Sequence, residues 1–373
     1  ALPVYDYEDL AADEAEAEYA KLRPPFAETF SPPLPGGLNY GKSLFWQARS
    51  FPEEFARARH ILSYAQYWSW MLCGVAATEC TTIGSHSDLW RPREGRFSSL
   101  PARLGWEKLF PPLRRADEVL GTIRPELAQA IGVNPDVRVA CGIHDSNASL
   151  LPWLGRAQPF SIASTGTWVI NFALGASLDA LDPARDCASN VSIRNEPVPS
   201  SRWMGGREFG LLVGDGDPAA SAEDLAAALD REECMVLPNQ GGQGGPFQGW
   251  PDMPAGDLAG ALGERGAAAA AALYCALMLD VTLDLVASAG DVIIEGSFAR
   301  NELLAALLAA LRPGQDVYVS EDQTGTTNGA LRLLAPKLPP PAAAKVAPLA
   351  APAPVLAHRE RWRARLRELR PSP

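Results

Sequence analysis

Short β-branched runs that stop at a glycine and pass into a helix are the feature that most restricts how this chain can fold. The run VRVA ends at Cys141–Gly142, and Asp145 follows where the chain turns. The run DVIIEG ends at Gly296, and Asn301 can cap the helix that comes next. Strands followed by helices in this way indicate an α/β fold, whose ligands gather at the carboxyl ends of the strands.

Other segments have equally regular patterns. FSIASTGTWVINFALG has two β-rich halves around Ser164–Thr167 and predicts a hairpin, whereas LPVYDY at the start of the chain is strand-like. The segment 335–354, rich in Pro and Ala, predicts an extended connection over the surface. Helices are predicted from Glu8 to Arg23, on both sides of a break near Phe51–Pro52, in LAQAIG with Gly132 as C-cap, near SAEDLAAALD, from Ala267 to Ser288, and in NELLAALLAALR.

Length and charge narrow the class of protein. With 373 residues and 47% hydrophobic residues, the chain is long enough for about two domains, and we place the boundary between residues 157 and 158. The formal net charge of -11 leaves no basic surface for nucleic acid over most of the chain. The basic segment from His358 to Arg370 has an apolar stripe at Trp362, Leu366 and Leu369, which favours a packed terminal helix over a nucleic-acid or membrane contact.

The six cysteines and the hydropathy indicate a protein of the cytoplasm. No CxxC pair or zinc-ligand spacing is present, so we expect reduced and mostly buried thiols. The longest apolar run, Ala267 to Leu279, is followed too soon by Asp280 and Asp284 for a membrane span. No signal peptide is visible, and a homodimer is compatible with the sequence.

Three turns are candidates for chemistry, and each also has a structural explanation. Ser164–Thr167 is either an ordinary tight turn or an anion nest with two hydroxyls. Gly296–Ser297 is either the usual exit from a sheet or the place where a flat base lies against the backbone. Asp145 is either a helix cap or a general base, and His144 is either a half-buried histidine with its own partners or a donor to a substrate hydroxyl.

The order of these motifs resembles the FGGY family of carbohydrate kinases over nearly the whole chain. GTIRPELAQAIGVNPDVRVACGIHDSNAS is similar to the stretch that carries the family's catalytic aspartate, STGTW to its second phosphate motif, and EGSFARN to its adenosine motif. GTTNGAL, from Gly325 to Leu331, resembles the helix start that closes the nucleotide cleft. The chain departs from the family pattern at Glu295, where a glycine is usual, at Cys73, where Thr is usual, and at Ala65–Gln66, where Pro-Asp or Asp is common.

The resemblance implies two ribonuclease-H-like α/β domains of the actin/hexokinase/Hsp70 type around a cleft, with sugar bound by residues 1–157 and ATP by residues 158–373. Asp145 would accept a proton from the sugar and contact Mg²⁺. His144 and Trp90 would contact the sugar, although most aromatic residues of this region, Trp90 among them, are expected in the core. The nucleotide would be bound by Ser164, Thr165, Gly166, Thr167, Gly206, Gly296, Ser297 and Asn301, with a plain turn as the alternative for Gly206.

The resemblance also limits what we expect of this chain. The family's first phosphate motif, an Asp-x-Gly hairpin, is absent from the sequence, so the first domain is expected to be truncated and the chain inactive by itself. His144 beside Asp145 is most similar to the deoxy-ketohexose branch, which implies phosphorylation at O1 of a sugar such as L-fuculose or L-rhamnulose. Another ketose or polyol is an alternative substrate, and a regulator that binds sugar or nucleotide without turnover is an alternative function.

Overall fold

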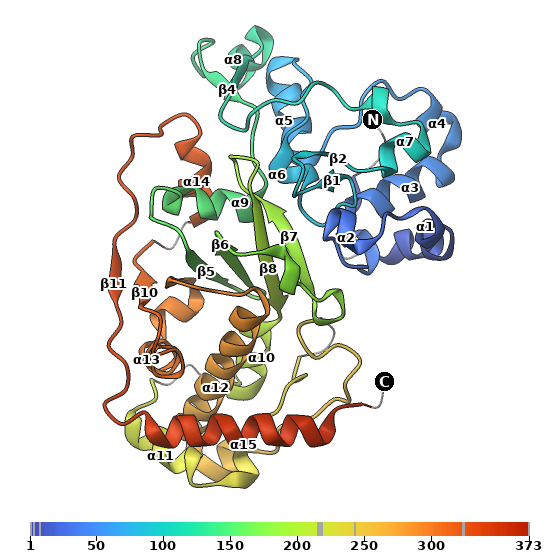
Figure 1. Cartoon of the computed structure of the whole chain (residues 1–373). Coiled ribbons are helices and arrows are strands. Elements are labelled where there is room, and N and C mark those ends of the chain that lie inside the picture. Colours follow the sequence, from blue (N-terminus) through green and yellow to red (C-terminus); the bar gives the residue numbers. More distant parts are fainter. Residues whose placement is uncertain are drawn as a thin grey trace. The chain divides into compact units, whose positions relative to one another are not determined.

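The computed structural model describes residues 2, 4–6, 9–214, 219–241, 244–322 and 325–371. Its contacts divide the chain into two compact units, each built from separate stretches of sequence (Figure 1). Unit 1 comprises Ala1–Leu154, Ala188–Val198 and Gly325–Pro340, and unit 2 comprises Gly155–Cys187, Pro199–Thr324 and Pro341–Pro373. The sugar-binding and ATP-binding roles of residues 1–157 and 158–373 stay predictions.

Unit 1 is mainly helical and packs around a hydrophobic core, rich in aromatic rings, that includes Tyr19, Trp46, Leu89 and Trp90. Its elements are η1 Leu10–Ala15, α1 Glu16–Leu22, α2 Phe26–Thr29, η2 Gly36–Leu38, α3 Tyr40–Ser50, α4 Pro52–Ala56, α5 Tyr64–Cys73, α6 Cys80–Ile83, β1 Trp90–Arg91, β2 Arg96–Phe97, α7 Leu100–Leu104, η3 Glu107–Leu109, β3 Val119–Thr122, α8 Pro125–Ile131, β4 Arg138–Ala140, α9 Asp145–Leu150, η4 Leu151–Trp153 and α14 Gly325–Arg332.

Two predictions for the first part of unit 1 are corrected. The helix break at Phe51–Pro52 is present, but a second break follows, so α3, α4 and α5 replace the two predicted helices. In this second break the N–H of Ile61 bonds to the carbonyl of Leu109, which takes the backbone out of a helix. LPVYDY forms no strand at its described residues, where Tyr5 instead packs edge-on against Trp46 with ring centroids 4.5 Å apart.

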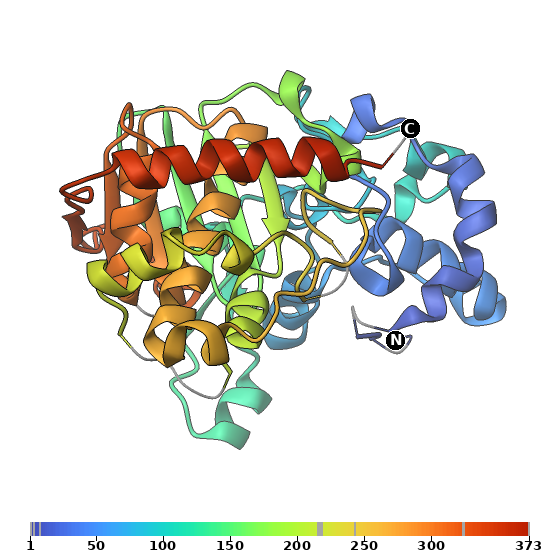
Figure 2. The same cartoon turned by 90° about the horizontal axis from the view of Figure 1, so that it is seen from below.

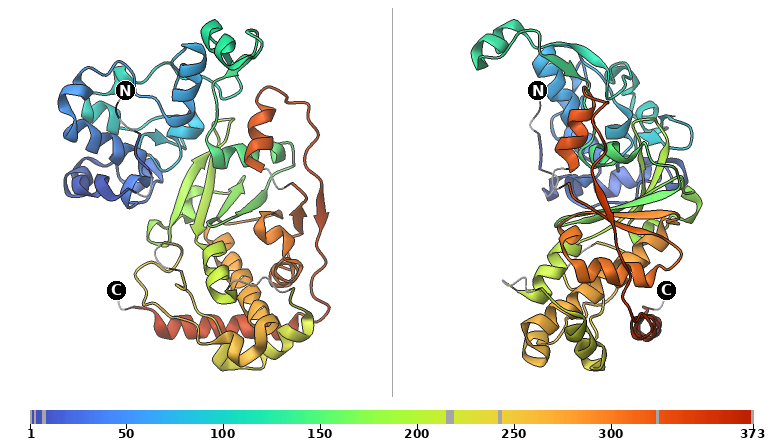
Figure 3. Two further views of the ribbon diagram at one scale, coloured as in Figure 1. Left: turned by 180° about the vertical axis from the view of Figure 1, so that it is seen from behind. Right: turned by 90° about the vertical axis from the view of Figure 1, so that its left-hand side faces the viewer.

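Strands β3 and β4 pair antiparallel and form, with α8, a small lobe beside α5 (Figures 1 and 3). The lobe has its own small core of Ile123, Ala128 and Val139. Gly132 ends α8 in the left-handed conformation, with φ of 73°, as the sequence predicts. Strand β4 of this lobe ends at Ala140, so the chain passes from the lobe directly into the turn that precedes Asp145.

Unit 2 is built on the large sheet of the protein, whose strand order is β11-β10-β9-β5-β6-β8-β7. Most of β7 and the first two residues of β8 fall in the stretch 188–198, which is counted with unit 1. The predicted hairpin is confirmed as the antiparallel pair β5 and β6, and β5 also pairs in parallel with β9. The elements of this part of the chain are β5 Phe160–Thr165, β6 Val169–Leu174, η5 Leu178–Ala180, η6 Pro183–Arg185, β7 Cys187–Val191, β8 Pro197–Trp203, α10 Gly205–Val213, α11 Ala222–Leu229, η7 Glu232–Cys234, α12 Leu258–Leu285, β9 Asp291–Gly296, η8 Ser297–Arg300, α13 Glu302–Leu311, β10 Val317–Ser320, β11 Ala343–Lys345 and α15 Ala353–Leu369.

The core of unit 2 surrounds α12. This helix is long and apolar enough to cross a membrane, but 94% of its most apolar window is buried inside the protein. It begins at Leu258, earlier than predicted, and Gly263 interrupts it with φ of 72°. Its run of alanines allows α10, α11 and α13 to pack close to it (Figure 1). We conclude that α12 is the central core helix of this unit.

The terminal helix α15 packs against α11 and α13 (Figure 2), with Trp362 and Leu366 buried as the apolar stripe predicts. Its basic residues have a partner in the core. Asp280 of α12 is 3% exposed and lies 2.9 Å from both Arg312 and Arg363. Because a buried carboxylate needs cationic partners, this cluster fixes α15 on the unit.

The connection 335–354 is extended, as predicted, but it also contains a strand. Residues Ala343–Lys345 pair antiparallel with β10 at the edge of the sheet. The N–H of Val346 continues this pairing by donating to the carbonyl of Val317. The sequence does not signal the strand because Ala and Lys are weak strand formers, and the edge of β10 supplies the hydrogen bonds instead.

All six cysteines are free thiols, as expected. Five are buried, and Cys73 is half-buried. Burial raises the pKa of the Cys187 thiol to about 11, so this thiol is protonated at neutral pH. The cysteines therefore behave as small apolar core residues.

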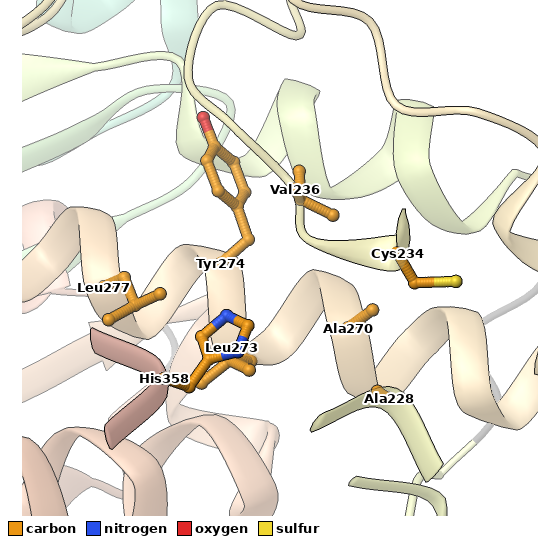
Figure 4. A pocket seen from close by; sticks show the side chains of 8 residues that line it. All are labelled: Ala228, Cys234, Val236, Ala270, Leu273, Tyr274, Leu277 and His358. Carbon is orange, nitrogen blue, oxygen red and sulfur yellow. The ribbon is translucent and has the colours of Figure 1, made fainter. Parts of the chain in front are cut away.

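His358 of α15 lies in a small cavity of unit 2, together with Cys234, Val236 and Tyr274 (Figure 4). The imidazole is 4% exposed, and its Nδ1 has no hydrogen-bond partner among the described residues. Burial, with a smaller effect of Arg361, lowers the pKa of His358 to about 4. The ring is therefore neutral over the whole range in which a histidine of the unfolded chain becomes charged.

This burial predicts a loss of stability in acid. The unfolded chain takes up a proton on His358 near pH 6.5, whereas the folded protein does so only near pH 4. The free energy of unfolding should therefore fall on the order of 3 kcal/mol through His358 as the pH decreases through this window. In urea unfolding at several pH values, His358→Gln should not show this fall in the free energy of unfolding. The control His60→Gln, at an exposed position, should follow the wild type; an unchanged slope in His358→Gln would contradict the assignment.

Candidate active site

Asp145 lies at the first position of α9, directly after the turn that follows β4. His144, not Asp145, occupies the N-cap position, and no side-chain hydrogen bond caps the helix. The Asp145 carboxylate is 75% exposed and accepts local hydrogen bonds, from the N–H of Ser146 at 2.5 Å and from its hydroxyl at 3.2 Å, with Nδ1 of His144 at 3.4 Å. The helix-cap alternative for Asp145 is therefore wrong, and the role of general base stays a prediction.

The pKa of the Asp145 carboxyl lies below its ordinary value. The surrounding protein atoms push this pKa upward, but the His144 ring and the hydrogen bonds from Ser146 outweigh them. The carboxyl group is therefore ionised at neutral pH. An exposed and ionised carboxylate at the end of a strand has the properties that a proton acceptor requires.

The His144 ring lies between two polar side chains. Its Nδ1 lies 3.4 Å from Nδ2 of Asn147, which can donate to it, and 3.4 Å from Oδ1 of Asp145, which can accept from it. Burial lowers the pKa of the ring, against a smaller opposite effect of Asp145, so the ring is neutral at neutral pH. The ring is mostly buried, at 17% exposure. A neutral ring carries one N–H group that can be donated.

Trp90 lies in the core of unit 1 rather than at its surface. The side chain is 2% exposed and packs edge-on against Phe97, with ring centroids 5.5 Å apart. The structure therefore gives Trp90 the core position that the sequence analysis expects for most aromatic residues here. Contact with a sugar stays a prediction.

In unit 2, the two predicted nucleotide turns lie side by side. Strands β5 and β9 are parallel neighbours, and their last residues, Thr165 and Gly296, pair with each other. The hydroxyl of Thr165 donates to the carbonyl of Glu295 and accepts the N–H of Phe298 at 2.9 Å. Ser297 Oγ lies 3.4 Å from the carbonyl of Thr165. The hydroxyl of Thr165 therefore joins the turns to each other.

Gly296 is required at this junction. Its φ of 80° is left-handed, and a Cβ atom there would lie 1.9 Å from the carbonyl oxygen of Thr165. Asn301, after the short helix η8, caps α13 by accepting the N–H of Leu304 at 2.9 Å, as predicted. The EGSFARN segment thus leaves β9 beside the Thr165 turn and enters α13.

Gly206 brings a helix N-terminus to the Ser164–Thr167 turn. A Cβ atom at Gly206 would lie 2.1 Å from the carbonyl oxygen of Gly166, so only glycine allows this approach. Gly166 and Thr167 at the tip of the turn are exposed, whereas Thr165 is 6% exposed. The structure therefore places the turn, the start of α10 and Gly296 in one region of unit 2, where N–H groups can meet an anion.

Helix α14 carries GTTNGAL and belongs to unit 1. It packs against α9, the helix of Asp145, and its Gly329 lies against the backbone of Ala148. The role of closing a nucleotide site stays a prediction. Within unit 1, α14 supports the helix that carries the candidate base.

The sequence analysis missed the buried polar residues behind Asp145. Glu79 is fully buried and accepts hydrogen bonds from the backbone and hydroxyl groups of Thr81 and Thr82. Thr81 Oγ1 in turn accepts the N–H of His144 at 3.1 Å. The local signal is the segment Glu79-Cys80-Thr81-Thr82, a pattern that fits a helix start as well as a support for a distant turn.

The described residues contain no group of three or more His, Cys, Asp or Glu side chains that could hold a metal ion. This finding is compatible with Mg²⁺, which usually takes one or two carboxylates and completes its octahedron with water and substrate phosphate. Asp145 offers one exposed carboxylate of the required kind. The chemistry of this carboxylate therefore fits a magnesium ligand.

Sequence profiles of known families match both parts of the chain. Residues 38–152 match the "FGGY family of carbohydrate kinases, N-terminal domain", and residues 157–342 match the "Carbohydrate kinase FGGY, C-terminal domain". The chain is also 31% identical to an L-fuculokinase of Haemophilus influenzae over 138 residues, which are 35% of this chain and 27% of the relative. This match spans about a quarter of the relative's length.

Solved structures agree with these matches. The crystal structure of a carbohydrate kinase from Novosphingobium aromaticivorans is 38% identical, has a TM-score of 0.85, and is matched over 98% of this chain and 80% of that one. A ligand-bound xylulose kinase from Lactobacillus acidophilus is 14% identical, with a TM-score of 0.76 over 97% of this chain and 78% of that one. The predicted ribonuclease-H-like α/β fold class is confirmed.

The Thr165 junction predicts a specific loss of stability. Thr165→Val would leave the carbonyl of Glu295 and the N–H of Phe298 without their partner, at a cost of about 1–3 kcal/mol. Thr165→Ser keeps the hydroxyl and should retain most of the stability. Thr167→Val, at the exposed tip of the same turn, should change the free energy of unfolding by less than about 0.5 kcal/mol. Urea unfolding measures all three; equal values for Thr165→Val and Thr167→Val would contradict the junction.

Proposed function

Because this chain belongs to the FGGY family of carbohydrate kinases, we propose that it transfers the γ-phosphoryl group of ATP to a sugar hydroxyl, with Asp145 as general base. The observation that carries the proposal is the Asp145 carboxylate, which is exposed and ionised at the start of α9. The family motif points to Asp145 as the residue for this role. The exposure of its carboxylate makes the group accessible to a substrate.

In the proposed reaction, a sugar hydroxyl donates its hydrogen to Asp145 as the oxygen attacks the γ-phosphorus. The proton passes to the carboxylate, and the bond between the γ-phosphorus and the bridging oxygen of ADP breaks. His144, whose ring is neutral at neutral pH, would donate its ring N–H to a sugar hydroxyl. These two side chains would orient the nucleophile, which is the largest task of a protein in phosphoryl transfer.

Unit 2 would bind the nucleotide through its paired turns. The exposed Gly166 and Thr167, together with the start of α10 at Gly206, would contact the phosphates. Thr165 would act mainly through the shape of the turn, because its hydroxyl is already bonded to the backbone. Ser164 is the first residue of this turn, and Gly296, Ser297 and Asn301 would border the adenosine.

Mg²⁺ would be held by Asp145 together with water and phosphate oxygens. When bound, the ion offsets the negative charge of the phosphates. We also place the protein in the cytoplasm, which its free thiols support.

For the substrate, we propose a 6-deoxy-ketohexose phosphorylated at O1. The similarity to an L-fuculokinase and the His144–Asp145 pair support this choice. The structural likeness to a xylulose kinase, at 14% identity, shows the fold alone. The alternative substrate is another ketose or a polyol.

The base predicts the effect of Asp145→Asn in the complete protein, with the first phosphate motif present. Turnover should fall by on the order of 10²–10⁴, because an amide cannot accept the proton. Binding of ATP and sugar, measured by calorimetry, should stay close to wild type. Asp136→Asn, in an exposed loop of unit 1, should keep full turnover. Near-normal turnover of Asp145→Asn would contradict the assignment. If the complete wild-type protein binds both ligands without any turnover, it is a non-catalytic binding protein.

The deoxy-sugar proposal predicts a preference within a panel of sugars. Burying one methyl group is worth roughly 1 kcal/mol, which corresponds to about a tenfold higher kcat/KM for the deoxy-ketose than for its hydroxylated counterpart. The assay compares L-fuculose and L-rhamnulose with D-xylulose, L-ribulose and glycerol. If neither deoxy-ketose is preferred, another family substrate replaces it, and the assignment of Asp145 is unaffected.

A further inference from the structure

We propose that Gln66 and Thr81 are positioning residues for Asp145, holding from behind the turn that carries it. This inference rests on the proposed function, because it concerns where the general base lies. Neither residue belongs to the motif around Asp145, and at Gln66 the chain departs from the family pattern. Both act on the backbone of residues 141–144 rather than on the carboxylate.

Gln66 of α5 donates both of its amide hydrogens to this turn. Its Nε2 lies 3.2 Å from the carbonyl oxygen of Cys141 and 3.2 Å from that of Gly142. The hydroxyl of Ser63 donates to Oε1 of the same amide, which fixes its orientation. Gln66 is 1% exposed, so water cannot replace these bonds. An aspartate, common in the family at this position, could not donate them.

Ser69, one turn further along α5, supports the same backbone. Its hydroxyl lies 3.0 Å from the carbonyl oxygens of both Ala140 and Cys141. Gly142 between these contacts has φ of 93°, a conformation that directs successive carbonyls toward α5. The exit from β4 is therefore bound along one side of α5.

Thr81 holds the other end of the turn. Its Oγ1 accepts the N–H of His144 at 3.1 Å and donates to Oε2 of Glu79 at 2.6 Å. Glu79 is fully buried and bonded in turn to the start of α6. The residue immediately before Asp145 is thus connected to a rigid helix end.

These contacts matter because, among the residues that the structure describes, the Asp145 carboxylate is held by its sequence neighbours Ser146 and His144. The position of the carboxylate therefore follows the position of the backbone at residues 141–144. A displacement of about 1 Å in such a group can reduce turnover by on the order of 10².

The test compares Gln66→Met with Gln129→Met, a control on the exposed face of α8. Methionine has a similar length but cannot donate to the carbonyls of Cys141 and Gly142. Turnover of Gln66→Met should fall by roughly 10- to 100-fold with an unchanged KM for ATP. In the Asp145→Asn background, Gln66→Met should cause no further loss, because both changes act through the same carboxylate.

A second measurement does not require turnover. The backbone amide hydrogens of residues 141–145, followed by NMR hydrogen exchange, should exchange faster in Gln66→Met, because the carbonyls of Cys141 and Gly142 lose their donor. In Thr81→Val the amide hydrogen of His144 should exchange faster, whereas Thr81→Ser, which keeps the hydroxyl, should restore the wild-type rate. This pair also carries the test if Gln66→Met does not fold.

The outcomes separate the two proposals. If Gln66→Met and Thr81→Val match their controls in both turnover and hydrogen exchange, the positioning role is overturned while the general base stands. If hydrogen exchange becomes faster but Asp145→Asn itself keeps normal turnover, the support of the turn stands and the proposed base is overturned. Equal losses from Gln66→Met with and without Asp145 would show a general structural effect and overturn the inference.

Discussion

The hydroxyl of Thr165 is the contact on which the candidate nucleotide site depends. It bonds to the backbone on both sides of Gly296 and so joins the ends of two parallel strands. Because β5 and β9 end level with each other, the segments that follow both strands start in the same place. The start of α10 adds a third backbone segment there, through the close approach of Gly206 to Gly166. The exposed tip of the turn is thus supported by buried contacts.

In unit 1 too, the candidate functional group is exposed and the residues that support its position are buried. Asp145 is exposed, whereas Gln66, Ser69, Thr81 and Glu79 behind it are buried. Their hydrogen bonds are made to backbone groups, which fixes the course of the chain without occupying the carboxylate. A functional group can then remain accessible while its position is defined by the packed interior.

Local signals explain which elements could be predicted from the sequence. The hairpin around Ser164–Thr167, the strand DVIIEG and the cap at Asn301 each have a turn or capping residue within a few positions, and the structure confirms all three. Strand β11 and the support from Gln66 have no such signal. Their partners are far away in sequence, so residue type alone does not identify them. For the same reason the pattern identifies Thr165 as important but not what its hydroxyl bonds to.

The burial of Asp280 has a consequence for the order of events during synthesis. This carboxylate lies on α12, but two of its partners, Arg359 and Arg363, belong to α15, which the ribosome makes after every other element of unit 2. Before α15 is made, Arg312, at the end of α13, must balance both Asp280 and the neighbouring Asp284, so this acidic pair lacks two of its cations. Unit 2 can therefore complete the packing around Asp280 only after α15 is available, and a nascent chain without α15 should be more exposed to chaperones.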